Sequence, residues 1–228
     1  MSFIEKYKET IIDSGYYTWL LEGFGNTITI TLGALAIGII IGTIISVVKY
    51  FSDDVPSLKP LNWLCDAYTT VIRGIPVVVL LLIFFFVVFA SSDNGVLVAI
   101  ITFGINSGAY MAELIRSGIQ AVDQGQMEAG RSLGMSKMQT MRKIIFPQAI
   151  RYILPAIGNE MIALLKETSV AGYVAVRDLT KAGDLTKNLT YDAVNPLLTV
   201  ALTYLVLVIL MTAALTKVEK RLAKSDKG

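Results

Sequence analysis

The sequence predicts an all-α integral membrane protein with five transmembrane helices and one long cytoplasmic loop. Two observations lead to this fold class. Hydrophobic residues make up 54% of the 228-residue chain and the mean hydropathy is +0.62, both high for a soluble domain. The apolar residues also gather in uncharged stretches of roughly 20 residues, the length of helix that crosses a bilayer core about 30 Å thick.

Residues 26–48, 74–92 and 94–112 carry no charge between their apolar residues and form the first three predicted spans. A helix that starts near Leu61 leads into the second span, and the third continues to about Ala121. Gly, Ala, Ser and Thr recur along the first and third spans, so these two helices are expected to pack closely.

Two further spans complete the prediction. Residues 193–216 are uncharged and form the last one. Residues 152–176 are apolar overall but contain Glu160, Lys166 and Glu167, and they are predicted as a fourth, weakly hydrophobic span. A charge at the bilayer centre costs about 2.5–3.5 kcal/mol, so this span needs protein or water around its polar face. We expect its helix to break at residues 168–169 with access for solvent.

The positive charges predict the orientation. In the five-span arrangement, three segments share one face of the membrane and hold most of the basic residues: the loop 122–150, the tail after Thr216 and the short loop after the first span. These are Lys49, Lys59, Arg131, Lys137, Arg142, Lys143, Lys217, Lys220, Arg221, Lys224 and Lys227. The positive-inside rule then places the C-terminus in the cytoplasm and the N-terminus outside. A four-span arrangement would divide this charge and is disfavoured. We therefore expect an extracytoplasmic segment 1–21, a membrane domain 22–217 and a cytoplasmic tail 218–228.

Several catalytic classes are excluded or disfavoured by what the chain lacks. The sequence has no His and a single cysteine, Cys65. It therefore lacks the commonest general base and metal ligand, and a membrane-embedded hydrolase is disfavoured. No GxxxxGK[ST] string occurs, so the chain carries no phosphate-cradling loop of its own.

The loop between the third and fourth spans has a defined pattern, EAGRSLGMSKMQTMRKIIFP at residues 128–147. Gly134 suits the left-handed residue that ends a first short helix. Ser136 followed by Gln139 is a capping box that starts a second helix, and Pro147 suits entry to the next span. Two simpler readings stay open on this pattern alone: a DNA-binding helix-turn-helix, which tethering to the membrane disfavours, and an amphipathic helix resting on lipid headgroups.

This motif, E-A-G-x-x-x-G-x9-I-x-F-P, resembles the "EAA" loop of ABC-importer permeases. Other segments resemble the polar amino-acid branch of these permeases: Arg73-Gly74-Ile75-Pro76, NSGAYMAELIRSGI at 106–119, PQA at 147–149, LPAIGNE at 154–160 and LLKETS at 164–169. The resemblance spans about residues 20–220. The chain departs from the family pattern at four positions. Gly130 stands where Ala is usual and Phe146 where Leu is usual. Ile75 stands where Thr is usual, and Leu80 where Gln is often found.

The resemblance implies a permease subunit, not an enzyme, of an ATP-driven importer for polar amino acids. Acidic residues exposed in its path would favour basic amino acids among these. The resemblance implies no cofactor in this chain, since ATP and Mg²⁺ are bound by two separate ATPase subunits. It also implies a second permease copy or paralogue, an extracytoplasmic substrate-binding protein and residence in the bacterial inner membrane, and it implies no nucleic-acid partner.

In such permeases the loop, here residues 122–147, is a coupling helix that docks in a groove of the ATPase. Glu128 and Ala129 then pack at the ATPase surface and Gly134 sets the turn. The small Ala129 and Gly130 permit a close approach, and Glu128 in the first turn suits the helix dipole. The cations of this loop that are placed to pair with acidic groups of the partner are Arg131 and Arg142.

Polar residues inside the spans are the candidates for substrate contact. Asn106, Tyr110 and Glu113 recur at helical spacing on one face of the third span, and part of this face, with Ser107, is expected to line the path. For Glu113, pairing with Arg116 one turn on is the favoured role.

Glu160 is the sharper candidate. It has no opposite charge within one helical turn and has Asn159 beside it, an arrangement suited to a substrate ammonium group. An ion pair with another span and a wet interfacial position are the alternatives. If Glu160 instead coupled an ion gradient, the chain would be a secondary amino-acid transporter, which leaves the 128–147 loop unexplained.

Overall fold

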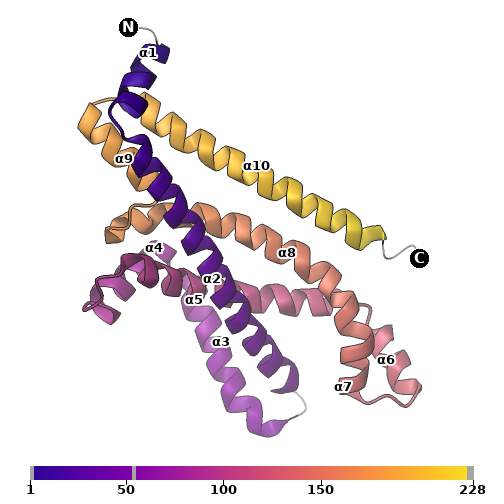
Figure 1. The fold of residues 1–228 in the computed structure, drawn as a ribbon. Coiled ribbons are helices and arrows are strands. Elements are labelled where there is room, and N and C mark those ends of the chain that lie inside the picture. The colour runs from indigo at the N-terminus through magenta and orange to yellow at the C-terminus, as the bar shows by residue number, and fades with distance from the viewer. Residues whose placement is uncertain (1–2, 53–54, 225–228) are drawn as a thin grey trace.

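The computed structural model describes residues 3–52 and 55–224, and over these residues the chain is helical throughout, without strands (Figure 1). Lys227 of the predicted tail lies outside the described residues. Two short N-terminal elements, α1 (Phe3–Tyr7) and the π-helical η1 (Lys8–Asp13), lead into the long helix α2 (Tyr17–Ser52).

Helices α2 and α5 (Gly95–Gln120) form the most extensive helix pair of the fold. Gly38, Gly42 and Ser46 follow one another every four residues on the buried face of α2, and Ser46 Oγ donates a hydrogen bond of 3.0 Å to Ala112 O on α5. On α5, Gly104 and Gly108 receive the side chains of Ile37 and Ile41. Small residues at this spacing bring two membrane helices into backbone contact, as the sequence predicted.

The second predicted span is bent, not straight. The short η2 (Pro56–Leu58) and α3 (Lys59–Gly74) are followed by α4 (Val77–Ile83) and the π-helical η3 (Phe84–Val88), and the two halves meet at 105°. Ile75 adopts an extended conformation (φ −103°, ψ 130°) before Pro76. The proline ring disfavours a helical residue before it and removes a backbone donor, so the helix ends at Gly74 and a new one begins after Pro76.

The polar loop folds into α6 (Gly125–Ser132) and α7 (Lys137–Thr140), and the chain then runs without a break through the π-helical η4 (Met141–Ile145) into α8 (Phe146–Glu167). The predicted break after Glu167 is confirmed, because the 3₁₀ segment η5 (Thr168–Val174) follows there. Solvent access differs between the two residues named at the break: Thr168 is fully buried, whereas Ser169 lines an open pocket of about 280 Å³.

The last two helices are α9 (Leu179–Thr190) and α10 (Val194–Lys224). Among the described residues, α2, α5 and α10 up to Leu222 are long and apolar enough to cross a membrane, and the bent pair of α3 with α4–η3 makes up to four. Helix α8 is not among these candidate spans, and it carries the charged residues Glu160, Lys166 and Glu167. The count of five spans therefore stays a prediction.

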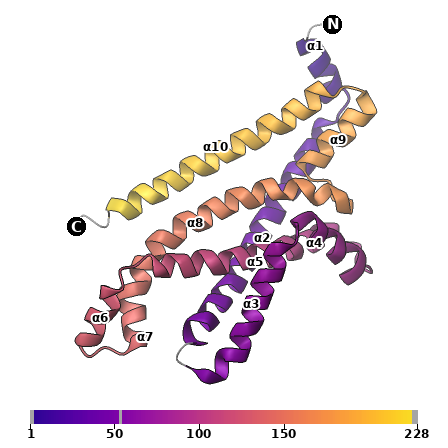
Figure 2. The ribbon, with the colours of Figure 1, turned by 180° about the vertical axis from the view of Figure 1, so that it is seen from behind.

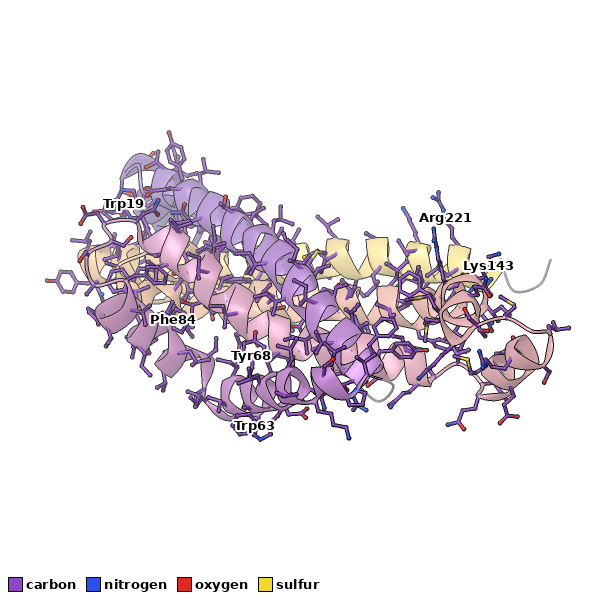
Figure 3. The ribbon with its side chains drawn as sticks, turned by 90° about the horizontal axis from the view of Figure 1, so that it is seen from below. Trp19, Trp63, Tyr68, Phe84, Lys143 and Arg221 are labelled. Carbon is purple, nitrogen blue, oxygen red and sulfur yellow. The ribbon has the colours of Figure 1, made fainter. Side chains whose placement is uncertain are left out.

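The two ends of the molecule differ in character. Helices α1 and α9 lie together at one end, and α6 and α7 lie at the other, near the C-terminal end of α10 (Figure 2). Trp19 and Phe84 lie at the first end, and the basic Lys143 and Arg221 lie at the second (Figure 3). The N-terminal segment is fastened at the first end, where Thr10 Oγ1 donates to Asp192 Oδ2 at 3.1 Å.

Candidate translocation and coupling sites

Ser107 and Glu160 meet where α5 crosses α8. Ser107 Oγ donates a hydrogen bond to Glu160 Oε1 at 3.1 Å, and Ser107 is fully buried. Gly38 of α2 also packs against Ser107, since a Cβ at that glycine would stand 2.8 Å from Ser107 Oγ. Within the described residues no basic side chain forms an ion pair with Glu160. The contact is thus a hydroxyl–carboxyl pair between two helices, without an ion-pair partner in the described part of the chain.

The other predicted substrate residues do not converge on this pair. Asn159 is exposed, and because it precedes Glu160 on the helix it points about 100° away. Asn106 is buried in the bundle. The ring of Tyr110 lies under the guanidinium of Arg73, with Cζ 5.3 Å from the ring centroid. Helix α3 is further tied to α5 by a hydrogen bond that Tyr68 Oη donates to Ile105 O.

A charge cluster joins the C-terminal parts of α2 and α5 to the middle of α3. Arg116 Nη2 lies 2.7 Å from Glu113 Oε2, so the predicted Glu113–Arg116 pair is confirmed. Lys49 Nζ lies 2.8 Å from Asp66 Oδ1 and 3.7 Å from Glu113 Oε1. Sequence reasoning missed Lys49 as a bridge, although a lone cation at the end of a long apolar span was a visible signal. The cluster gives Glu113 a structural task and removes it from the candidate substrate residues.

The turn between α6 and α7 is a Schellman motif. Gly134 has φ +82°, as its left-handed role required. Gly134 N donates to Arg131 O at 3.0 Å, and Met135 N donates to Gly130 O at 3.1 Å. These two bonds satisfy the last carbonyls of α6. Arg131 Nη1 adds a hydrogen bond of 3.1 Å to Met135 O.

The start of α7 has the predicted capping box. Ser136 Oγ accepts from Gln139 N at 3.2 Å, and Ser136 N donates to Gln139 Oε1 at 2.8 Å. Pro147 occupies the first turn of α8, as expected. The loop is therefore a hydrogen-bonded helix–turn–helix unit, and its shape was readable from sequence because each bond spans only a few residues.

The predicted coupling residues divide into an outer and an inner group. Glu128, Ala129, Arg131 and Arg142 are exposed, which leaves them available to a partner. Gly130 is different: it is buried on the inner side of α6, where a Cβ would stand 2.5 Å from Thr140 Cγ2. Its small size serves the approach of α7, so the expectation that Gly130 eases the approach of a partner does not fit its position.

The loop is packed against the membrane helices. Met127 and Met141 pack on a buried cluster that contains Ile115 of α5, Val122 just after this helix and Ile145 of η4. Lys137 Nζ lies 5.0 Å from the ring centroid of Tyr50 on α2. A cavity of about 580 Å³ lies beside these contacts, with Glu128 and Asp123 among its lining residues. In the described part of the chain no cluster of side chains suited to a metal ion occurs.

A bundle of apolar helices, with a carboxyl group between two of them and a packed helix–turn–helix at one end, is the architecture expected of a membrane transport subunit. Residues 38–224 match the family of inner membrane components of binding-protein-dependent transport systems, and the chain belongs to this family. It is thus the permease subunit of an ABC importer, and the ion-coupled alternative finds no support.

The chain is similar to several members of this family. It is 34% identical over 211 residues to the arginine transport system permease protein ArtQ of Bacillus subtilis (strain 168), covering 91% of this chain and 94% of the relative. It is 36% identical over 211 residues to the probable glutamine ABC transporter permease protein GlnM of the same organism, covering 92% and 95%. A solved amino acid ABC transporter with histidines matches with a TM-score of 0.86 and 35% identity, over 97% of this chain and 99% of that chain.

Proposed function

We propose that this permease imports polar amino acids, with basic ones favoured, and that Glu160 holds the ammonium group of the substrate. The observation that carries the proposal is the carboxylate of Glu160, held by Ser107 and without an ion-pair partner in the described chain. An uncompensated charge in a membrane span is costly unless a ligand, water or a partner group meets it. The names of the relatives, which include arginine and glutamine permeases, support an amino-acid substrate.

The test replaces the charge and keeps the shape. The complex, reconstituted in liposomes with its ATPase and binding protein, is assayed for uptake of labelled arginine and glutamine. Glu160→Gln should raise the apparent KM for the imported amino acid by about tenfold or more, because a charged hydrogen bond contributes about 1.5–3 kcal/mol. Glu167→Gln, the same change two turns along α8, is the control. Unchanged uptake by Glu160→Gln at normal expression would remove Glu160 from the site.

The exposed face of α6, together with Arg142 of η4, is proposed as the docking surface for an ATPase subunit, with Glu128, Ala129 and Arg131 as the contact residues on α6. Two such ATPases, with ATP and Mg²⁺, and a second permease copy or paralogue complete the proposed importer. Glu128→Lys should lower the amount of ATPase that co-purifies, because it places a cation at the positive N-terminal end of a helix and reverses the surface charge. Ser132→Lys, at the other end of α6, is the control, since a cation suits that end. Full ATPase recovery with Glu128→Lys would contradict the docking surface.

The orientation follows from the same arrangement. Loop 122–147 and the tail 218–228 are proposed to be cytoplasmic and the segment 1–21 extracytoplasmic, supported by the position of Lys143 and Arg221 at one end of the molecule (Figure 3). Alkaline phosphatase and fluorescent-protein fusions at each terminus test this proposal. Phosphatase activity of a C-terminal fusion would overturn it.

A further inference from the structure

Helices α6 and α7 approach each other closely where Gly130 faces the side chain of Thr140. Gly130 of α6 and Thr140 of α7 are both buried. A Cβ at residue 130 would stand 2.5 Å from Thr140 Cγ2 and 2.8 Å from Thr140 Oγ1, distances that two atoms cannot keep. The Thr140 side chain therefore occupies the space that any larger residue at 130 would need.

Thr140 has little freedom to give way. Its branched Cβ restricts its rotamers. Its Oγ1 donates a hydrogen bond of 3.0 Å to Ser136 O, and Ser136 is itself held by the capping box with Gln139. On the other side of the contact, Gly130 O accepts from Met135 N in the Schellman turn. Both partners are thus fixed by bonds of the turn that joins their helices.

Thr140 belongs to a long continuous helical segment, called the rod below, which bends between α7 and α8 (Figure 1) and contains Pro147 and Pro155. From Lys137 the chain stays helical through η4 and α8 to Glu167. Glu160 follows Thr140 by 20 residues on this rod, a separation of roughly 30 Å along the helix axis at the rise of an α-helix. The base of the rod is braced by Met141 and Ile145, which share a cluster with Met127 of α6.

We propose that the Gly130–Thr140 contact makes α6 and the α7–η4–α8 rod one rigid body, so that a displacement of α6 by a cytoplasmic partner is delivered to α8 and to Glu160. The inference rests on the proposed docking role of α6. Gly130 and Thr140 are positioning residues in it: neither contacts substrate or partner, and both fix the angle at which the docking helix meets the rod. The departure from the usual Ala at position 130 then has a cause in this chain, because a buried Thr140 fills the space.

Four proteins test the contact: wild type, Gly130→Ala, Thr140→Ala and the double variant. Helix propensity alone predicts that Gly130→Ala is harmless or helpful, because Ala is the better helix former. The contact predicts that Gly130→Ala is harmful and that adding Thr140→Ala restores function. Removal of Thr140 Cγ2 and Oγ1 leaves Thr140 Cβ, at 3.2 Å, as the nearest atom to the new methyl group. Gly25→Ala, where a Cβ meets nothing within 4 Å, is the matched control.

The first readout is transport coupling in the reconstituted complex with ATPase and binding protein, measured as the number of arginine or glutamine molecules imported per ATP hydrolysed. Gly130→Ala should lower this ratio by about tenfold, as overpacking of this kind shifts an equilibrium by about that factor. The double variant should recover to within about twofold of Thr140→Ala, because the two sites are in contact and their effects are not additive.

The second readout is the distance between spin labels at Ser132 of α6 and Tyr152 of α8, two exposed positions, with the buried Cys65 replaced by Ala. The distance distribution should broaden in Gly130→Ala and narrow again in the double variant. The inference would be overturned if Gly130→Ala kept the wild-type distance distribution and the wild-type number of amino acids imported per ATP. It would also be overturned if the double variant did not recover. Failure of the proposed function is a separate result: it appears in the wild type, as an absence of ATP-driven uptake or of a bound ATPase.

Discussion

Gly42→Ala probes the closest approach of α2 and α5. A Cβ at residue 42 would stand 2.4 Å from Met111 Cβ and 2.8 Å from Ala112 N. The second neighbour is backbone, so no rotamer change relieves the clash and the helices must separate. Ordinary contact begins near 3.4 Å, so the required displacement is about 1 Å at this point.

The loss of stability follows from what that displacement breaks. Overpacking of a close helix contact costs about 1–3 kcal/mol. One turn further along α2, Ser46 Oγ donates to Ala112 O at 3.0 Å, and a separation of about 1 Å takes this bond beyond hydrogen-bonding distance. Its loss adds about 0.5–1.5 kcal/mol. We therefore expect Gly42→Ala to destabilise the permease by roughly 2–4 kcal/mol, although Ala is the better helix former.

Reversible unfolding in mixed micelles with increasing sodium dodecyl sulfate, followed by circular dichroism, measures this difference. Ser46→Ala separates the two terms, since it removes the hydrogen bond without the clash and should cost only about 1 kcal/mol. Gly25→Ala, in open space on the same helix, should be neutral or slightly stabilising. A Gly42→Ala protein as stable as the Gly25→Ala protein would refute the close approach of α2 and α5.

Three further predictions concern other parts of the fold. Burial raises the pKa of Asp178, the N-cap of α9, to about 6 against its backbone hydrogen bonds. Because this pKa lies above the ordinary 3.8, the folded state binds the proton of Asp178 more tightly than the unfolded state does. The free energy of unfolding is therefore highest below pH 4 and falls by about 3 kcal/mol as the pH rises through 6. Asp178→Asn should abolish that difference between unfolding midpoints at pH 4 and pH 8, and an unchanged pH profile would argue against it. Lys49→Met should destabilise by about 0.5–1 kcal/mol, less at high salt, whereas Lys59→Met should not; equal effects would contradict the bridge from α2 to Asp66 and Glu113. Gly134→Pro should release the ATPase or uncouple transport, because proline cannot adopt φ +82°; normal coupled transport would show that the turn is dispensable.

Local features were predicted well because short-range chemistry determines them. The capping box at Ser136, the left-handed Gly134 and the entry of Pro147 into α8 each depend on residues within one turn. The third span, predicted from residue 94 to about Ala121, is found as Gly95–Gln120, with Asn94 Oδ1 accepting from Leu97 N at its start. The bend at Pro76 was also a local signal, although an uninterrupted apolar run concealed it.

Contacts between distant residues were not predictable in the same way. Ser107 and Glu160 are 53 positions apart, and spacing along one helix says nothing of which face another helix presents to it. The same limit explains the expectation for Gly130: a small residue in a loop suggests approach by a partner, and only the path of α7 shows that Thr140 takes the space.

The sequence by itself determined the class of this protein: a helical membrane permease with a helix–turn–helix loop between two of its helices, because hydropathy and turn chemistry are properties of contiguous residues. Only the tertiary structure decided that Ser107 holds Glu160, that Lys49 bridges α3 and α5, and that Gly130 belongs to the interior of the loop. The reason is physical. These side chains are placed by the packing of small-residue helix faces, and that packing is a property of helix pairs, which no single segment specifies.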